Sequence, residues 1–263
     1  TNAVLGTSGT LTATDVDSAT TFVAQTNVAG SNGYGKFSIT TGGAWTWTAN
    51  SALNGLKQGE TVTDSVTVAT ADGTSQLLTV TISGSNDAAV ISGTTTASLT
   101  ETNAVLSTSG TLTATDVDSA TTFVAQTNVA GSNGYGKFSI TTGGAWTWTA
   151  NSALNGLKQG ETVTDSVTVA TADGTSQLLT VTISGSNDAA VISGTTTASL
   201  TETNAVLSTS GTLTATDVDS ATTFVAQTNV AGSNGYGKFS ITTGGAWTWT
   251  ANSALNELHQ DQQ

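Results

Sequence analysis

Two short acidic motifs recur along the chain and are the residue groups best suited to chemistry. One is Asp-Val-Asp, present at Asp116-Val117-Asp118 and Asp217-Val218-Asp219. The other is Asn-Asp, present at Asn86-Asp87 and Asn187-Asp188. Carboxylate and amide oxygens are the ligands of hard cations, and Ca²⁺ accepts about six to eight of them in flexible geometry. The motifs therefore predict calcium binding, provided that the fold brings them together.

The composition excludes most other chemistry. The chain has no Cys and one His, His259, which rules out a thiolate zinc site and a Ser-His-Asp arrangement in each repeat. Mg²⁺ demands stricter octahedral geometry and suits the motifs less than Ca²⁺. A glycosidase with paired carboxylates stays formally open, but nearly all the acids fall at predicted junctions or turns. We therefore expect no enzymatic activity.

A repeat of 101 residues organises the chain. Residues 102–202 repeat residues 1–101 with one change, Gly6 to Ser107, and a third copy keeps the register from Thr203 to Asn256. A period of this length is too long for one coil of a solenoid, and it suits a domain that buries its own core. We predict a repeat without its first strand over 1–86, a complete repeat over 87–187, and a partial repeat with a divergent tail over 188–263.

Each period has the composition of strands. Thr and Val are frequent, and short alternating runs are separated by clusters of Gly, Asn, Asp and Ser. In the complete repeat we predict about seven strands, A to G, over Val90–Leu99, Gly110–Thr115, Thr121–Gln126, Lys137–Thr141, Ala145–Ala150, Thr162–Thr171 and Ser176–Ser184. Residues 128–136 are expected to form a loop, and residues 151–161 have room for a turn of helix. The predicted fold is all-β, a tandem array of Ig-like antiparallel β-sandwiches.

Side-chain parity predicts what the sandwich buries. Trp146 and Trp148 lie two residues apart and must share a face of their strand. Asp165 has the parity of the inward-facing Val163 and Val167, and a lone buried carboxylate is costly. A bulge or a position at the rim is therefore expected at Asp165.

Because strands reverse direction at each turn, acids that are distant in sequence are predicted to meet where two repeats join. Four or five carboxylates would repel one another there, and Ca²⁺ would relieve the repulsion. The alternative is that these motifs form ordinary polar turns, as Asp and Asn often do. The first predicted junction comprises Glu60, Asn86, Asp87, Asp116 and Asp118, and the second comprises Glu101, Glu161, Asn187, Asp188, Asp217 and Asp219.

Other partners are constrained by charge and hydropathy. Each period carries five Asp and two Glu against two Lys, which argues against nucleic acid because binding it requires basic patches. The chain has no apolar run of the roughly 18 residues that a membrane span needs, and no secretion signal. A carbohydrate or surface polysaccharide is the alternative ligand, since Tyr34, Trp45 and Trp47 could form a stacking platform. Against this, a Trp between Thr residues in a strand usually fills the core.

Several phrases of the repeat resemble a known family. They are Gly-Thr-Leu-Thr-Ala-Thr-Asp-Val-Asp-Ser at 9–18, Gly-Ala-Trp-Thr-Trp-Thr at 43–48, Gly-Glu-Thr-Val-Thr-Asp-Ser-Val-Thr-Val at 59–68, Ala-Asp-Gly-Thr at 71–74 and Leu-Thr-Val-Thr-Ile-Ser-Gly-Ser-Asn-Asp at 78–87. In order and spacing they are similar to the VCBS repeat, a cadherin-like module of large bacterial adhesins of the RTX, LapA-like type. One departure is Ala88-Ala89, where the family usually has Pro after Asn-Asp.

The resemblance implies a location and a role. It implies type I secretion, display on the bacterial cell surface, domain junctions stiffened by calcium, and a part in attachment or biofilm. Near-identical copies favour a spacer, because a spacer lengthens with each duplication while a binding site gains little beyond avidity. The predicted function is a non-catalytic extender region of a surface adhesin, in which each repeat contacts its neighbours in the same chain.

Overall fold

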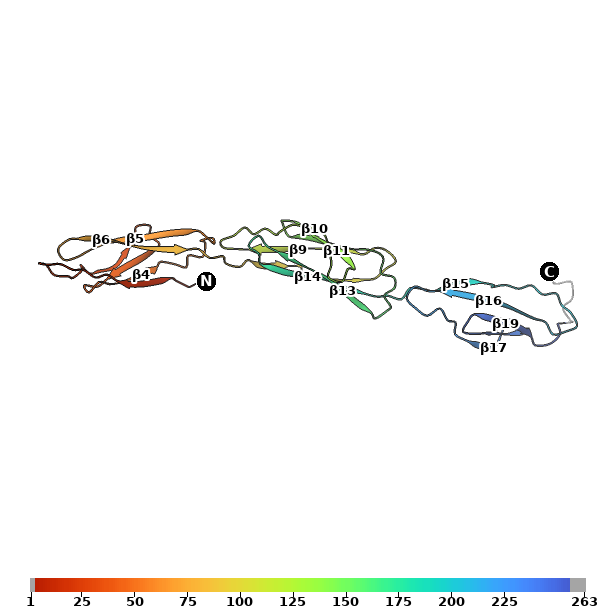
Figure 1. Ribbon diagram of the computed structural model, residues 1–263. Helices are drawn as coiled ribbons and strands as arrows, with labels where there is room; N and C mark the ends of the chain where they lie inside the picture. Colours follow the sequence, from red (N-terminus) through yellow and green to blue (C-terminus); the bar gives the residue numbers. More distant parts are fainter. Residues whose placement is uncertain (1–2, 256–263) are drawn as a thin grey trace.

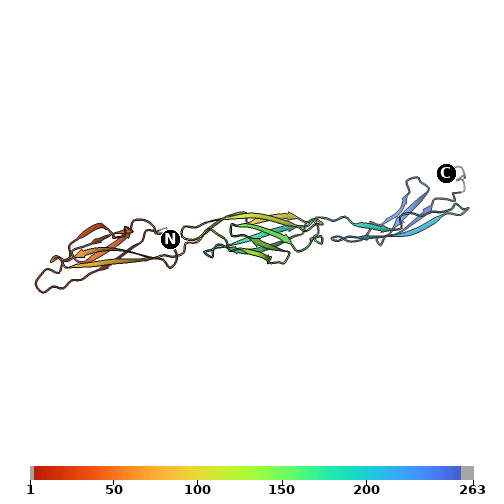
Figure 2. The same cartoon turned by 90° about the horizontal axis from the view of Figure 1, so that it is seen from above.

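The computed structural model describes residues 3–255 and shows a chain built of strands (Figure 1). Three units lie end to end in both views (Figures 1 and 2). Within the described residues, no helix is long and apolar enough to cross a membrane. The prediction of an all-β fold is confirmed.

The middle unit is a sandwich of two sheets. Their strand orders are β10-β11-β12-β9-β7 and β13-β14-β8. If β7 and β8 are counted as two halves of strand A, the unit has the predicted seven strands. The bounds are β7 Val90–Gly93, β8 Thr96–Thr100, β9 Ser107–Thr115, β10 Gln126–Ala130, β11 Gly136–Ile140, β12 Ala145–Ala150, β13 Thr162–Ala170 and β14 Ser176–Ser184.

Strand A changes sheet in its middle. β7 pairs antiparallel with β9, and β8 pairs parallel with β14. The predicted antiparallel sandwich thus contains one parallel pair, because strand A crosses to the second sheet without reversing direction. Gly93 lies at the crossing with φ of 110°, and a Cβ there would lie 2.4 Å from the Thr111 carbonyl oxygen. Only glycine fits this position without strain.

The third strand of the repeat begins later than predicted. Residues 121–125 contribute only an isolated bridge between Phe123 and Thr171, and the strand itself is β10. The pairing of β10 with β11 shifts between Gln126 and Val129, where Asn128 has φ of 54°. Asn tolerates this left-handed conformation, so a bulged strand lies partly within the segment that was predicted to be a loop. Residues 151–161 form turns and no helix.

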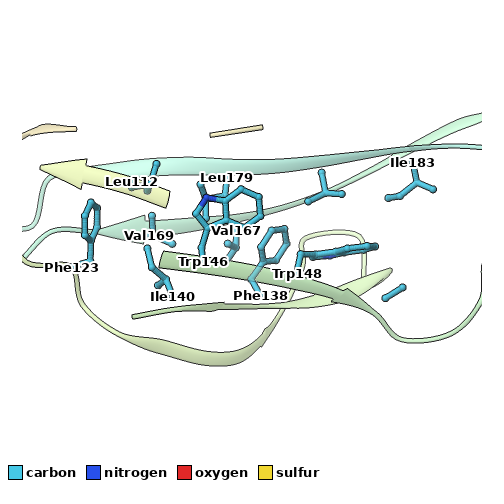
Figure 3. Close-up of a cluster of buried hydrophobic side chains, with 12 residues drawn as sticks. Leu112, Phe123, Phe138, Ile140, Trp146, Trp148, Val167, Val169, Leu179 and Ile183 are labelled. Atoms are coloured by element: carbon cyan, nitrogen blue, oxygen red, sulfur yellow. The ribbon is translucent and has the colours of Figure 1, made fainter. Parts of the chain in front are cut away.

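The space between the two sheets is filled by aromatic and branched side chains (Figure 3). Trp146 and Trp148 point inward from β12, as their parity predicts, and are 1% and 0% exposed. The rings of Phe138 and Trp148 lie 6.4 Å apart at 57°, a tilted arrangement that aromatic pairs favour. Burial of these large side chains is the main source of stability in this unit.

Asp165 is buried in this core, and the bulge or rim position expected for it is wrong. The β13–β14 register runs without a break from Thr162 to Ala170. The Asp165 side chain is 0% exposed and accepts hydrogen bonds from the backbone N–H groups of Asn133 and Gly136 and from Trp148 Nε1. These donors offset the cost of taking the carboxylate out of water.

The two outer units contain parts of the same sandwich. The first has β1 Gly6–Thr10, β2 Gln25–Ala29, β3 Gly35–Ile39 and β4 Ala44–Ala49 in one sheet, and β5 Thr61–Ala69 and β6 Ser75–Ser83 in the other. The described residues of the third form one sheet of β15 Val191–Gly194, β16 Ser208–Thr216, β17 Gln227–Ala231, β18 Gly237–Ile241 and β19 Ala246–Ala251. Phe239 is accordingly 46% exposed, against 1% for its counterpart Phe138.

Candidate functional site

The first junction brings four of its predicted residues together. Asp116 Oδ1 accepts hydrogen bonds from the N–H groups of Asp118 (2.9 Å) and Ser119 (2.7 Å), which fixes the turn after β9. Asp118 is 4% exposed, and its Oδ2 accepts the Asp87 N–H at 3.2 Å. The Ser119 hydroxyl donates to Asn86 Oδ1 at 3.3 Å. The Asp-Val-Asp loop therefore holds the Asn-Asp linker by direct contacts.

Asp173, in the turn between β13 and β14, also belongs to this junction and was missing from the predicted set. Its Oδ2 accepts the Ala89 N–H at 2.9 Å and the Asn86 amide at 3.5 Å. Burial raises the pKa of this carboxyl, but hydrogen bonds from Thr171, Thr175 and Ala89 outweigh burial and hold the pKa well below its usual range. Counting strand reversals already places this turn at the linker end, so the signal was available in the sequence.

The second junction gathers acids from two repeats. Glu101 is 1% exposed, and its Oε2 accepts the Ser186 hydroxyl at 2.9 Å. Asp219 Oδ2 accepts the Asp188 N–H at 3.3 Å. Burial raises the pKa of Asp188, and the charges of Glu101, Asp219 and Asp217 raise it further.

Asn103 is a further member of the second junction that the sequence did not identify. With its amide oriented to donate, Asn103 Nδ2 lies 2.7 Å from Asp188 Oδ1. Asn103 follows the end of strand A by three residues, so the same strand end supplies both an acid and an amide to the junction. Without a motif around it, this Asn gave no signal in the sequence.

Glu60 and Glu161 lie beside the linkers, but their carboxylates are engaged elsewhere. Glu60 Oε2 accepts the Lys57 N–H at 3.0 Å, and Glu161 Oε2 accepts the Lys158 N–H at 3.0 Å. Their backbone carbonyls accept the N–H groups of Gly84 and Gly185, at the ends of β6 and β14. Both side chains therefore close their own loops in this structure, and a role as metal ligands would require them to turn toward the linker.

The junction oxygens fit a hard cation in type, although they do not surround one point. Among residues 3–255, no three His, Cys, Asp or Glu side chains converge as a ready metal centre. Two carboxylate oxygens, Glu101 Oε1 and Asp116 Oδ2, are nevertheless shielded from solvent without a hydrogen-bond partner. A shielded carboxylate oxygen without a partner is costly. Ca²⁺ takes such oxygens as ligands and tolerates irregular geometry.

The aromatic residues proposed for sugar stacking belong to the core of the first unit. Trp47 is 2% exposed and donates through Nε1 to Asp64 Oδ2 at 3.2 Å. It therefore has no free face, and its assignment to a stacking platform is wrong. Tyr34 and Trp45 are half-buried and pack against the same core.

The middle repeat matches a known domain family. Residues 86–185 match the bacterial cadherin-like domain family. This repeat is cadherin-like. Such domains suggest an extracellular role of the adhesion type, and they are generally structural rather than catalytic. No curated protein matches the chain.

Three solved structures illustrate the likeness. A protocadherin gammaB7 EC3-6 cis-dimer is 14% identical with a TM-score of 0.46, over 96% of this chain and 62% of that one. The protocadherin gammaB4 extracellular domain is 13% identical with a TM-score of 0.44, over 95% and 41%. Mouse cadherin-23 EC22-24 is 15% identical with a TM-score of 0.42, over 89% and 76%. The chain thus spans 41% and 62% of the length of the two protocadherins it matches.

Proposed function

We propose that the chain is a non-catalytic extender region of a bacterial surface adhesin of the VCBS, RTX type, which supports attachment or biofilm. Calcium bound at the repeat junctions stiffens it. The cadherin-like match of residues 86–185 supports an extracellular repeat. The end-to-end arrangement of the units supports a spacer (Figures 1 and 2). The repeat boundaries that go with this role are 1–86, 87–187 and 188–263.

The observation that carries the proposal is that acids from two successive repeats contact the same short linker, Glu101 at Ser186 and Asp219 at Asp188. At the second junction, Glu101 comes from the end of strand A of one repeat, and Asp217 and Asp219 come from the next repeat. Asp188 lies between them in the linker, where burial and then the charges of Glu101, Asp219 and Asp217 raise its pKa. A cation at this point would relieve the repulsion and tie both repeats to one centre.

The linker itself provides little rigidity. It has four residues of coil, from Gly185 to Asp188, between β14 and the two alanines that precede β15. Domains joined by a small interface move relative to one another by default. Calcium is therefore expected to change the shape of the chain far more than its secondary structure.

The test is a calcium titration combined with small-angle scattering of the 263-residue chain. We expect saturable calcium binding, and a maximum dimension that is larger and better defined with calcium than with chelator, at constant circular dichroism. Asp219→Ala should weaken binding at the second junction, while Asp72→Ala, which removes an exposed acid far from both linkers, should not. Equal dimensions and flexibility with and without calcium would overturn the stiff-spacer proposal.

A further inference from the structure

The two Asn-Gly pairs of the middle unit differ in how firmly they are held. Because Gly has no Cβ, its backbone nitrogen can approach the side-chain amide of a preceding Asn and displace ammonia. At Asn133-Gly134 this approach is blocked. Asn133 Nδ2 donates to the Thr164 carbonyl at 2.7 Å. The Gly134 N–H donates to the Gly131 carbonyl at 3.0 Å, so both the amide and the nitrogen that would attack it are fixed by hydrogen bonds.

At Asn155-Gly156 the corresponding groups are not held. The pair lies at the tip of a turn that is closed by the Leu157 N–H, which donates to the Leu154 carbonyl at 3.0 Å. Within residues 3–255 the Gly156 N–H donates no hydrogen bond, and a Cβ at this exposed residue would have nothing within 4 Å. Asn155 Oδ1 has no hydrogen-bond partner in the described part of the chain. The Gly156 nitrogen can therefore turn toward the Asn155 side chain at little cost.

The turn at the end of the first unit shows that a complete following repeat leaves this space open. Gly55 occupies the position of Gly156 there and faces the middle unit, whose sandwich has both sheets. It is exposed, and the nearest atom to a Cβ at Gly55 would be the Val117 carbonyl oxygen at 3.9 Å. The freedom of the glycine is thus a property of the turn itself.

The Asn155 side chain reaches the second junction. Asn103 lies 2.7 Å from Asp188 Oδ1 and 3.2 Å from the side-chain amide of Asn155. A single side chain therefore separates Asn155 from the linker acid. A carboxylate in place of the Asn155 amide would add one negative charge to the acids that already gather around Asp188.

We propose that Asn155-Gly156 is a deamidation site, at which the ageing chain gains a carboxylate beside the second junction. The Gly156 nitrogen loses its proton to hydroxide and forms a bond to Asn155 Cγ. The Cγ–Nδ2 bond then breaks, ammonia leaves with a proton taken from water, and a succinimide ring remains. Water opens the ring at either carbonyl, which leaves an aspartate or an isoaspartate. The reaction consumes water and releases ammonia, and no electrons are transferred.

Mass spectrometry of tryptic peptides tests the site. Residues 37–57 and 138–158 have the same sequence, so the 263-residue chain is used with Asn54→Gln, which makes the peptide of residues 138–158 unique. During incubation at mildly alkaline pH, this peptide should gain the mass difference between a hydroxyl and an amino group. It should also split into two chromatographic peaks, because two isomeric products form. A peptide that keeps its amide would refute the proposal.

The peptide of residues 1–36 is the internal control. It contains Asn32-Gly33, where Asn32 Nδ2 donates to the Thr63 carbonyl at 2.8 Å and the Gly33 N–H donates to the Gly30 carbonyl at 3.0 Å. These bonds must open before the reaction, so Asn32 should lose its amide at least about tenfold more slowly than Asn155. In denaturant the two pairs should react at similar rates. Similar rates in the folded chain would contradict the argument from the fold.

Gly156→Ala tests the attacking nitrogen without disturbing the fold. The added Cβ has open space, so the melting temperature should stay the same, while crowding at the nitrogen should nearly abolish the modification of Asn155. An unchanged rate of deamidation in this variant would show that the reaction does not proceed through the Gly156 nitrogen.

The effect on the junction rests on the proposed function and is measured separately. Asn155→Asp carries the charge of one product, and Asn155→Gln is its neutral matched control. In calcium titrations of the 263-residue chain, Asn155→Asp should bind calcium at the second junction at least about threefold more tightly than Asn155→Gln. Equal affinities would overturn this effect. An absence of calcium binding in both variants would refute the calcium junction together with this effect, whereas the mass measurement alone decides the modification.

Discussion

Replacing Asp165 by Ala tests how the core tolerates a carboxylate. The side chain accepts three hydrogen bonds, from Asn133 N at 2.9 Å, Gly136 N at 2.8 Å and Trp148 Nε1 at 3.2 Å. Asp165→Ala leaves all three donors without an acceptor in a region that excludes solvent. Each orphaned donor costs about 1–3 kcal/mol. Since water entering the small cavity recovers part of this, we expect the free energy of unfolding to fall by about 3–5 kcal/mol.

The assay is calorimetry on the full chain, with Thr164→Ala as the control. Thr164 precedes Asp165 on β13, points to the opposite face and is exposed, so its loss should cost under about 1 kcal/mol. For a domain of this size, about 1 kcal/mol corresponds to about 4–8 °C in Tm. The transition of the middle unit should therefore fall by about 12–40 °C in Asp165→Ala.

Asp165→Asn refines the same experiment. The amide keeps one acceptor oxygen but turns an NH₂ group toward the remaining donors, so we expect a smaller loss than with Ala and a larger one than with the Thr164 control. If Asp165→Ala melts within the range of Thr164→Ala, the carboxylate does not support these donors, and the account of its burial is wrong.

Three further predictions concern the glycine beside Asp165, the tryptophans beside strand A, and the linker residue Asp188. Gly131→Ala should cost about 1–3 kcal/mol by thermal melting, because its Cβ would lie 2.0 Å from the buried carboxylate, whereas Gly156→Ala, with nothing within 4 Å, should be neutral. Trp146→Ala should lower the free energy of unfolding by about 3–5 kcal/mol, and Trp45→Ala should lower it clearly less, because strand A covers only Trp146. Equal losses of unfolding free energy in denaturant titrations would contradict this. Asp188 must lose its proton to bind calcium, and its pKa is raised. Calcium affinity at the second junction should therefore fall as the pH is lowered from 7, at a higher pH than the one at which ordinary carboxylates protonate. Calcium titrations that show the same affinity across this pH range would refute the prediction.

The sequence predicted the strands best where hydrophobic periodicity and turn residues agreed. Ala145–Ala150 and Ser176–Ser184 have the predicted bounds, since each alternates cleanly and follows a Gly-containing turn. The third strand was misplaced because its regular pattern is interrupted by Asn128 in a left-handed conformation. Parity alone could not show this, because a bulge adds a residue without changing composition.

For the junctions, counting strand reversals was sufficient to bring together Asn86, Asp87, Asp116 and Asp118. It could not tell which way a side chain turns once it arrives, and Glu60 caps its own loop instead. Counting places backbone segments at one end of a sandwich, whereas the local hydrogen-bond donors decide the rotamer. The Glu60 side chain turns toward the backbone N–H of Lys57, three residues earlier, and a pattern of strands does not encode such a contact.

The same sequence in different surroundings separates what is local from what is tertiary. The pairing of β18 with β19 matches that of β11 with β12 residue for residue, although the described residues of the third unit contain no second sheet. Hairpin register is thus set by the turn and the strand pairs themselves. Burial is not, because Phe239 is 46% exposed where Phe138 is 1% exposed. In the middle unit, the sheet of β13, β14 and β8 therefore covers the side chains that the other sheet turns inward, and burial between the two sheets supplies the hydrophobic stabilisation.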